Sequence, residues 1–338
     1  MRRNPQGGYS LPELLIAMTI MLAISGAAVT ALLKMQNAQA TIWNRTQMHS
    51  GIRGATEVLQ QEVGQAGRIA LPMTAAGVPY AITLTAAVTV PATVPPTPVT
   101  ATLTIASTKP TGDRTEGMFL GERLVVGTGT AQETVTVTAL ASNSITAAFS
   151  KSHNAGEPVL APGAFGTGIV PPLTSPSTYA PGGATFTYTD GSTDSVLKLY
   201  GDINADGKMV YIEYTCDTTV SYNLYRNVMA WNAATKPAVA ASQVLLSNVR
   251  PNPNATPCFT YQTARVAGNV YVTDVAITLT VQTQIIDPVT KQFQTQTKAL
   301  LNVSPRNTFN AWQMASLGIA NRIQPMPPTI TALLTPLP

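Results

Sequence analysis

The chain has 338 residues, enough for one large domain or two smaller ones. Only 11% of the residues are charged and the formal net charge is +4, of which Arg2 and Arg3 supply two. The remaining charge is too small for a duplex nucleic-acid binder, so no nucleic-acid partner is expected. Two cysteines and two histidines exclude a cysteine-dense knot and argue against a multi-histidine metal site.

An apolar segment near the N-terminus predicts a membrane-spanning helix. Residues 14–33 contain no Asp, Glu, Lys or Arg, and at about 1.5 Å per residue they span roughly 30 Å, the thickness of a bilayer core. Arg2 and Arg3 precede this segment, so the positive-inside rule places the N-terminus in the cytoplasm and the residues after 34 outside. Apolar residues continue at helical spacing, so we expect one helix from Leu11 to Gln65.

One acid lies at the edge of this apolar run. Glu13 follows Ser10 by three residues, with Pro12 between them. This spacing fits a capping box at the start of a helix, where proline is tolerated in the first turn. The alternative is a carboxylate that waits for a partner outside its own helix, because an acid inside an apolar span is costly.

The segment from Gly7 to Ile16, GGYSLPELLI, resembles the prepilin signature of type IV pilins and type II secretion pseudopilins. The resemblance implies that a prepilin peptidase removes the leader 1–8 by cutting between Gly8 and Tyr9, and then methylates Tyr9. Glu13 would be the family's fifth mature residue. In a filament its carboxylate would meet the Tyr9 amine of a neighbouring subunit, so replacing Glu13 by Ala or Lys should block assembly and spare membrane insertion.

An ordinary secretory signal is the competing interpretation of the N-terminus. Ala38-Gln39-Ala40 fits a signal-peptidase site and would release a soluble chain that starts at Thr41. The apolar run is longer than the 7 to 15 residues typical of a signal peptide. We therefore favour a retained helix.

After Gly67 the helical pattern gives way to short alternating strands, so the predicted fold class is α+β, with a long N-terminal helix packed on an antiparallel β domain. A small inserted β module is expected, in which His153 lies in an exposed polar turn. The tail is expected to be flexible or bound by a partner. The expected segments are the stem helix 9–67, a Pro/Thr-rich connection 68–116, the inserted module 117–161, a Pro/Gly-rich linker 162–193, the β domain 194–307 and a Pro-rich tail 308–338.

Residues 9–67 and about 190–307 also resemble the PilW-like minor pilins and, more loosely, pseudopilin J of type II secretion. The resemblance rests on motifs such as Leu197–Tyr200 and Ile212–Tyr214 and on the closing Arg306-Asn307. It implies a minor pilin of the inner membrane, and later of the extracellular pilus, that primes assembly or caps the filament tip. The implied partners are prepilin peptidase, other major and minor pilins, the inner-membrane assembly platform and membrane lipid. A secretion pseudopilin, and a tip adhesin or DNA-uptake pilin, are the alternatives.

Residues 202–213 match the spacing of a calcium loop, with Asp202, Asn204 and Asp206 at alternate positions, then Gly207, and Glu213 in twelfth place. The flanks resemble strands, so Glu213 would lie too far along its strand to close the loop. A Ca²⁺ site would then use the three polar side chains and the Lys208 carbonyl. The alternative is a hairpin turn that ends in Asp206-Gly207. No other cofactor is expected.

Cys216 and Cys258 are the two cysteines, and the predicted topology places both outside the cytoplasm. A disulfide between them is favoured in an oxidising compartment, and two free buried thiols are the alternative. The sequence contains none of the H-E-x-x-H, G-x-S-x-G or Walker A motifs, so no enzyme activity is predicted.

Overall fold

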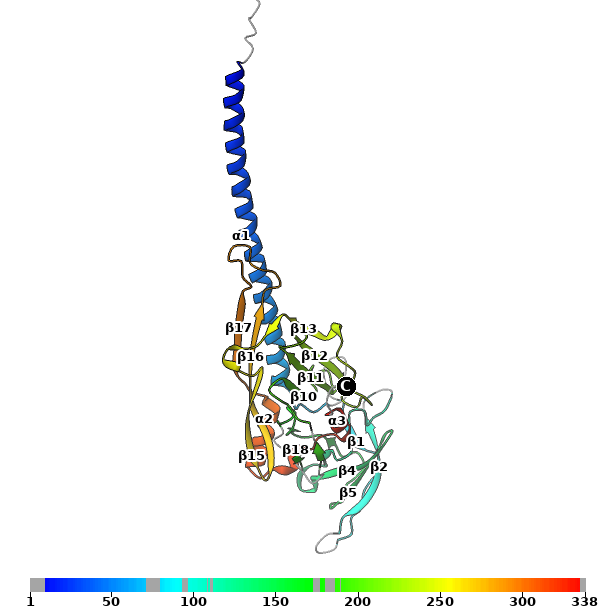
Figure 1. The fold of residues 1–338 in the computed structure, drawn as a ribbon. Coiled ribbons are helices and arrows are strands. Elements are labelled where there is room, and N and C mark those ends of the chain that lie inside the picture. Colours follow the sequence, from blue (N-terminus) through cyan, green and yellow to red (C-terminus); the bar gives the residue numbers. More distant parts are fainter. Residues whose placement is uncertain are drawn as a thin grey trace, which may run out of the picture. The chain divides into compact units, whose positions relative to one another are not determined.

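The computed structural model describes residues 10–70, 80–92, 97–107, 109, 112–172, 177–179, 186–188 and 190–334. The predicted class is confirmed, because one long N-terminal helix is followed by antiparallel sheets (Figure 1). The leader 1–8 and Tyr9 lie outside the described residues.

Helix α1 runs from Leu11 to Gln65, the bounds that the sequence predicts. It ends just before Gly67, whose φ of 82° is a left-handed value that favours glycine at a helix C-terminus. A Cβ on Gly67 would also lie 2.9 Å from the Phe165 carbonyl oxygen. The side-chain amide of Asn307 donates to the carbonyls of Gln65 and Ala66, which satisfies acceptors that the helix itself leaves open.

The chain forms two compact units. The first contains α1 up to Gly51 together with the segment Gln282–Gln296. The second contains Ile52–Val281 and the chain from Thr297 onward. The first unit therefore holds the apolar part of α1, and the second holds the sheets.

A six-stranded antiparallel sheet replaces the small module expected at 117–161. The Pro/Thr-rich connection 68–116 supplies two of the strands, because residues 105–107 pair with 82–84 and residues 99–104 pair in register with 144–149. The buried face includes Leu103, Ile105 and Ile145. In spatial order the strands are β1 (Ile82–Leu84), β2 (Val99–Ser107), β5 (Ser144–Phe149), β4 (Glu133–Ala141), β3 (Arg123–Val126) and β6 (Val159–Leu160).

Two further sheets form the expected β domain. One is antiparallel and has the order β10 (Val196–Gly201), β11 (Val210–Asp217), β12 (Asn223–Ala230) and β13 (Val244–Ser247). In the other, β16 (Asn269–Gln282) lies between β14 (Val249–Arg250) and β15 (Phe259–Val266) and also pairs with β17 (Thr295–Val303). Short 3-10 helices lie at η1 (Gly129–Ala131), η2 (Ala241–Gln243) and η3 (Pro253–Ala255).

Residues 308–334 form helices and a short strand, so the expectation of a flexible tail is wrong for them. Met326, Ile330 and Leu333 are buried in a cluster with Phe165 and Tyr200, which also corrects the expectation that 162–193 lacks core residues. The elements here are α2 (Arg306–Ser316), η4 (Ala320–Arg322) and α3 (Pro328–Leu333), with the parallel pair β7 (Ala164–Phe165) and β18 (Ile323–Gln324) and the antiparallel pair β8 (Ser177–Tyr179) and β9 (Phe186–Tyr188).

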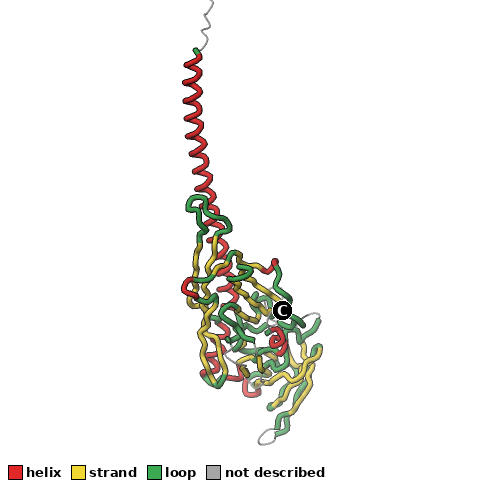
Figure 2. Tube along the Cα trace, in the orientation of Figure 1, coloured by secondary structure: helices red, strands yellow, loops and turns green. Residues whose placement is uncertain are grey.

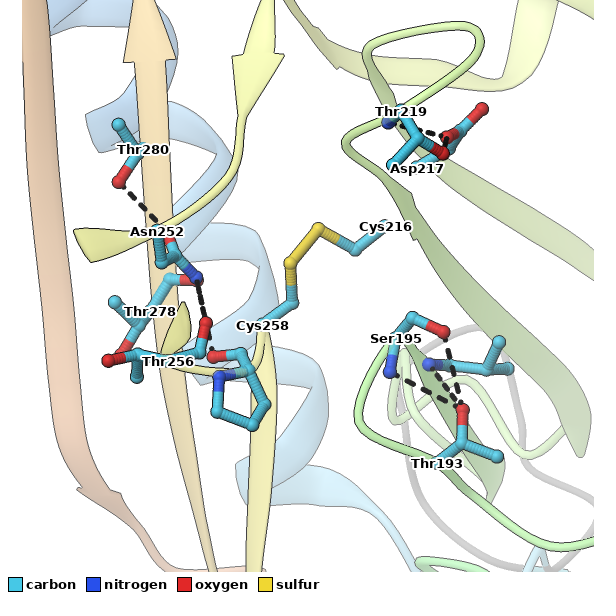
Figure 3. Close-up of a disulfide and its surroundings, with 12 residues drawn as sticks. Thr193, Ser195, Cys216, Asp217, Thr219, Asn252, Thr256, Cys258, Thr278 and Thr280 are labelled. Atoms are coloured by element: carbon cyan, nitrogen blue, oxygen red, sulfur yellow. Dashed lines mark hydrogen bonds between the residues drawn. A yellow bond between two sulfur atoms is a disulfide. The ribbon is translucent and has the colours of Figure 1, made fainter. Parts of the chain in front are cut away.

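A disulfide joins Cys216 in β11 to Cys258, directly before β15, with the two Cα atoms 6.5 Å apart (Figure 3). This is the favoured one of the two alternatives that the sequence left open. Beside it, the Asn252 amide donates to the Thr278 carbonyl at 2.8 Å, and the Thr280 hydroxyl donates to the Asn252 side-chain oxygen. The bond therefore links the two sheets of the β domain at a point already fixed by hydrogen bonds.

Candidate functional site

The start of α1 carries the acid that the sequence singles out. The Glu13 carboxylate accepts hydrogen bonds from the Ser10 backbone N–H at 3.2 Å and from the Ser10 hydroxyl at 3.1 Å. The backbone contact is one half of a capping box. Glu13 is solvent-exposed, so its carboxylate is also accessible to a group from outside the helix.

The helix after Glu13 exposes apolar side chains on all sides, because every residue from Leu14 to Leu33 is exposed. The two threonine hydroxyls in this stretch bond within the helix: Thr19 donates to the Ile16 carbonyl at 2.8 Å, and Thr30 donates to the Gly26 carbonyl at 2.7 Å. An apolar surface whose threonine hydroxyls bond to the helix's own carbonyls suits hydrocarbon better than water.

Among the described residues, α1 is the one helix that is long and apolar enough to cross a membrane. The predicted single-pass helix therefore has a structural counterpart. Later in α1, apolar residues continue at helical spacing but are buried: Ile52, Leu59 and Val63 lie within the second unit.

A partly buried ion pair fixes this later part of α1 to the β10–β13 sheet. The Glu62 carboxylate accepts the Nε–H of Arg226 at 3.0 and 3.2 Å and also accepts the Tyr214 hydroxyl. Burial raises the pKa of Tyr214, and the Glu62 carboxylate raises it further. Tyr214 therefore remains a hydrogen-bond donor, and the helix is positioned by polar contacts as well as by apolar packing.

In the first unit, the loop between β16 and β17 lies beside α1, as the green segment in Figure 2 shows. The Thr41 hydroxyl donates to the Asp287 carboxylate at 3.0 Å, and the Arg45 guanidinium donates to the Gln294 side-chain oxygen. Desolvation raises the pKa of Asp287, but the N–H groups of Thr290 and Val289 outweigh it, so that the pKa is lowered. The loop is thus attached to the helix through Asp287 and Gln294.

The candidate calcium loop has the geometry of a turn. The Asp202 carboxylate accepts the backbone N–H groups of Asp206 at 3.0 Å and of Gly207 at 3.3 Å, and Arg68 lies 3.7 Å from it. Burial raises the pKa of Asp202, although these donors oppose the shift. The Asp206 carboxylate in turn accepts the Lys208 N–H. The Asp202 and Asp206 carboxylates, two of the expected cation ligands, thus already face donors, which favours the hairpin-turn alternative.

The last residue of the calcium pattern lies elsewhere. Glu213 is buried in β11, where Lys236 lies 2.7 Å from its carboxylate and the Tyr211 hydroxyl donates to it. Asn204 is exposed in the turn. Across the described ranges, no group of three His, Cys, Asp or Glu side chains could hold a metal ion.

Sequence reasoning missed the environment of His153. Instead of lying exposed in a turn, its buried ring contacts Glu157 at 2.6 Å through Nδ1 and Glu133 at 2.8 Å through Nε2. A neutral imidazole has a single N–H, so only the protonated ring can donate to both carboxylates. The contact lowers the pKa of Glu157. The only sequence signal was the spacing of four between His153 and Glu157.

No family model, curated protein or solved structure compared with the chain matches it.

Proposed function

We propose that the protein is a minor pilin of a type IV pilus system, processed after Gly8 and incorporated into the filament through α1. The observation that carries the proposal is an exposed acid at the first turn of a helix whose residues 14–33 are uncharged and all exposed, directly after a prepilin-like leader. A soluble protein would have to cover such a helix, because it rarely exposes large contiguous apolar patches.

The chemistry of Glu13 supports an assembly role. Cleavage after Gly8 would create an α-amine four residues before Glu13. In a filament core of low dielectric, an amine from a neighbouring subunit would interact with this carboxylate far more strongly than in water, although desolvation cancels part of the gain. Ser10 offers the carboxylate only two weak donors, so a cationic amine can compete for it.

Intact-mass analysis tests the processing step. In a host with prepilin peptidase, the chain should lose residues 1–8 and gain one methyl group. When the peptidase is inactive, the chain should retain residues 1–8 and carry no added methyl group. The matched variant Gly8→Val should remain uncut in both hosts. A chain that starts at Thr41, or that keeps Met1 with the active peptidase, contradicts the proposal.

Gene deletion separates pilus assembly from the alternatives. A minor pilin that primes assembly should be required for surface filaments. A secretion pseudopilin should be dispensable for pili and required for export of an enzyme, and a tip adhesin or DNA-uptake pilin should leave filaments present but non-adherent or non-competent.

A further inference from the structure

The loop between β16 and β17 exposes apolar side chains beside the helix that would cross the membrane. Ile285 is 63% exposed and Val289 61%, and Ile286 and Phe293 are also exposed. An open groove of about 650 Å³ lies between this loop and α1, lined by Ile285 together with Gln36, Gln39, Ile42 and Trp43 among others. Neither the fold of the loop nor the proposed assembly role requires this apolar surface.

The charged side chains of the loop leave a positively charged surface exposed. Its one acid, Asp287, is buried and accepts N–H groups of Val289 and Thr290 and the Thr41 hydroxyl. Its one base, Lys291, is exposed, as are Lys34 and Arg45 on α1. The surface that reaches solvent is therefore apolar and positively charged, which is the chemistry of a segment that lies on anionic lipid.

The position along α1 agrees with a lipid partner. Gln36 and Gln39, which line the groove with Ile285, follow Leu33 by three and six residues, or by about 4.5 and 9 Å of helix. The headgroup layer extends roughly 5 to 8 Å beyond the hydrocarbon core. If residues 14–33 fill that core, Ile285 lies at the depth of the headgroups.

We propose that the loop 285–293 is a lipid-binding collar that rests in the headgroup layer of the bilayer crossed by α1 and binds anionic lipid. This proposal rests on the membrane-inserted state of the proposed function. The collar would hold the globular part of the chain against the membrane before assembly, and it would have to leave the lipid when a subunit is extracted.

The test uses the full chain reconstituted in phosphatidylcholine vesicles with and without phosphatidylglycerol. A single tryptophan is introduced by Ile286→Trp in a background with Trp43→Phe, Trp231→Phe and Trp312→Phe. Its fluorescence should be quenched more by a nitroxide on the lipid headgroup than by one deep in the acyl chain. The matched variant Leu301→Trp, on an exposed site of β17 eight residues beyond Phe293, should be quenched much less.

The second arm of the test varies the charge of the lipid and the side chains of the loop. Phosphatidylglycerol should increase headgroup quenching of the Ile286→Trp probe, and Lys291→Gln should reduce that increase. Replacing Ile285 and Phe293 by Ser should make the probe more accessible to a water-soluble quencher. Since both side chains are exposed, folding should survive, as near-ultraviolet circular dichroism would verify.

Two results would overturn the collar. Equal quenching of the Ile286→Trp and Leu301→Trp probes by a water-soluble quencher would show a loop in water. The probe at 286 could instead be protected from the water-soluble quencher without being quenched by the headgroup nitroxide. If that protection also rises with the density of protein in the vesicles, a second copy of the chain covers this surface. Neither result depends on filaments, so failure of the collar leaves the processing test intact. Conversely, if the loop binds lipid as expected but active prepilin peptidase does not cut the chain, only the pilin assignment is rejected.

Discussion

Glu122 is a residue whose sequence context gives no sign of its environment. It is 1% exposed, and its carboxylate has one described partner, the backbone N–H of Phe119 at 3.2 Å. Burial raises the pKa of Glu122 to about 8. The native state thus holds a proton that the unfolded chain releases near pH 4.3.

This difference predicts a pH-dependent stability. The stabilisation from the retained proton is fully present below about pH 4.3 and is lost as the pH rises towards 8, by at most about 1.4 kcal/mol per pH unit. Glu122→Gln should flatten this slope in thermal unfolding of the detergent-solubilised chain. The exposed Glu116→Gln should keep the wild-type slope, and a Glu122→Gln variant that also keeps it would contradict the account.

The environment of a single residue was predicted well where its partner is evident from the sequence alone. The two cysteines had only each other as disulfide partners, and Asp206-Gly207 marked the turn after β10. His153 was predicted wrongly because one of its two carboxylates, Glu133, is 20 residues away. Pairing between strands decides such contacts, and local polarity does not reveal it.

At the scale of elements, the contact between α1 and the β10–β13 sheet depends on Glu62. Glu62→Gln would leave the Arg226 guanidinium beside an uncharged amide and weaken the bond from Tyr214. Because Arg226 is 31% exposed, water offsets part of the loss, and we expect a destabilisation of about 2 kcal/mol.

Denaturant unfolding of matched variants measures this effect. Glu57→Gln breaks the fully exposed pair with Arg53 on the same helix and should have a clearly smaller effect, because exposed ion pairs contribute little. Equal losses in the two variants would show that Glu62 does not fix the helix to the sheet.

The disulfide should stabilise the β domain against unfolding. It joins residues 42 apart, and in the chain-entropy model a loop of this length contributes about 4 kcal/mol. Replacing Cys216 and Cys258 by Ser should lower the free energy of unfolding by about 4 kcal/mol and with it the midpoint of denaturant unfolding. A reducing agent should lower the midpoint of the wild type in the same way. A midpoint that does not respond to either change would contradict this prediction.

The element with the longest periodic pattern, α1, was predicted with correct bounds. Helix α3 was missed because the prolines around it were interpreted only as breakers of regular structure. Pro327 and Pro328 instead begin α3, where the missing N–H of proline costs nothing. The pairing of the Thr-rich strand β2 with β5 could not be predicted from spacing, because 36 residues separate the two strands.

At the scale of the whole molecule, the C-terminal segment completes the core of the second unit. Met326, Ile330, Leu333 and Leu334 are all buried, and each buried apolar side chain contributes roughly 1.5 to 3 kcal/mol. Truncation after Gln324 should therefore abolish cooperative unfolding and make the chain sensitive to protease. Truncation after Leu334 keeps these side chains and should be tolerated; if both truncations behave alike, the segment is not part of the core.

The central claim is that α1 assembles into a filament through the charge of Glu13. Glu13→Gln removes that charge and keeps an oxygen acceptor for Ser10, because Gln also serves in a capping box. The variant should be cut after Gly8 and inserted in the membrane like the wild type. Its failure in assembly would then be due to the lost charge.

The most direct measurement is the fraction of this chain found in sheared surface filaments relative to the fraction in the membrane, for wild type, Glu13→Gln and the control Glu57→Gln. We predict that Glu13→Gln is found in the membrane at the wild-type level and is absent from filaments, while Glu57→Gln is incorporated normally. Normal incorporation of Glu13→Gln would contradict the account.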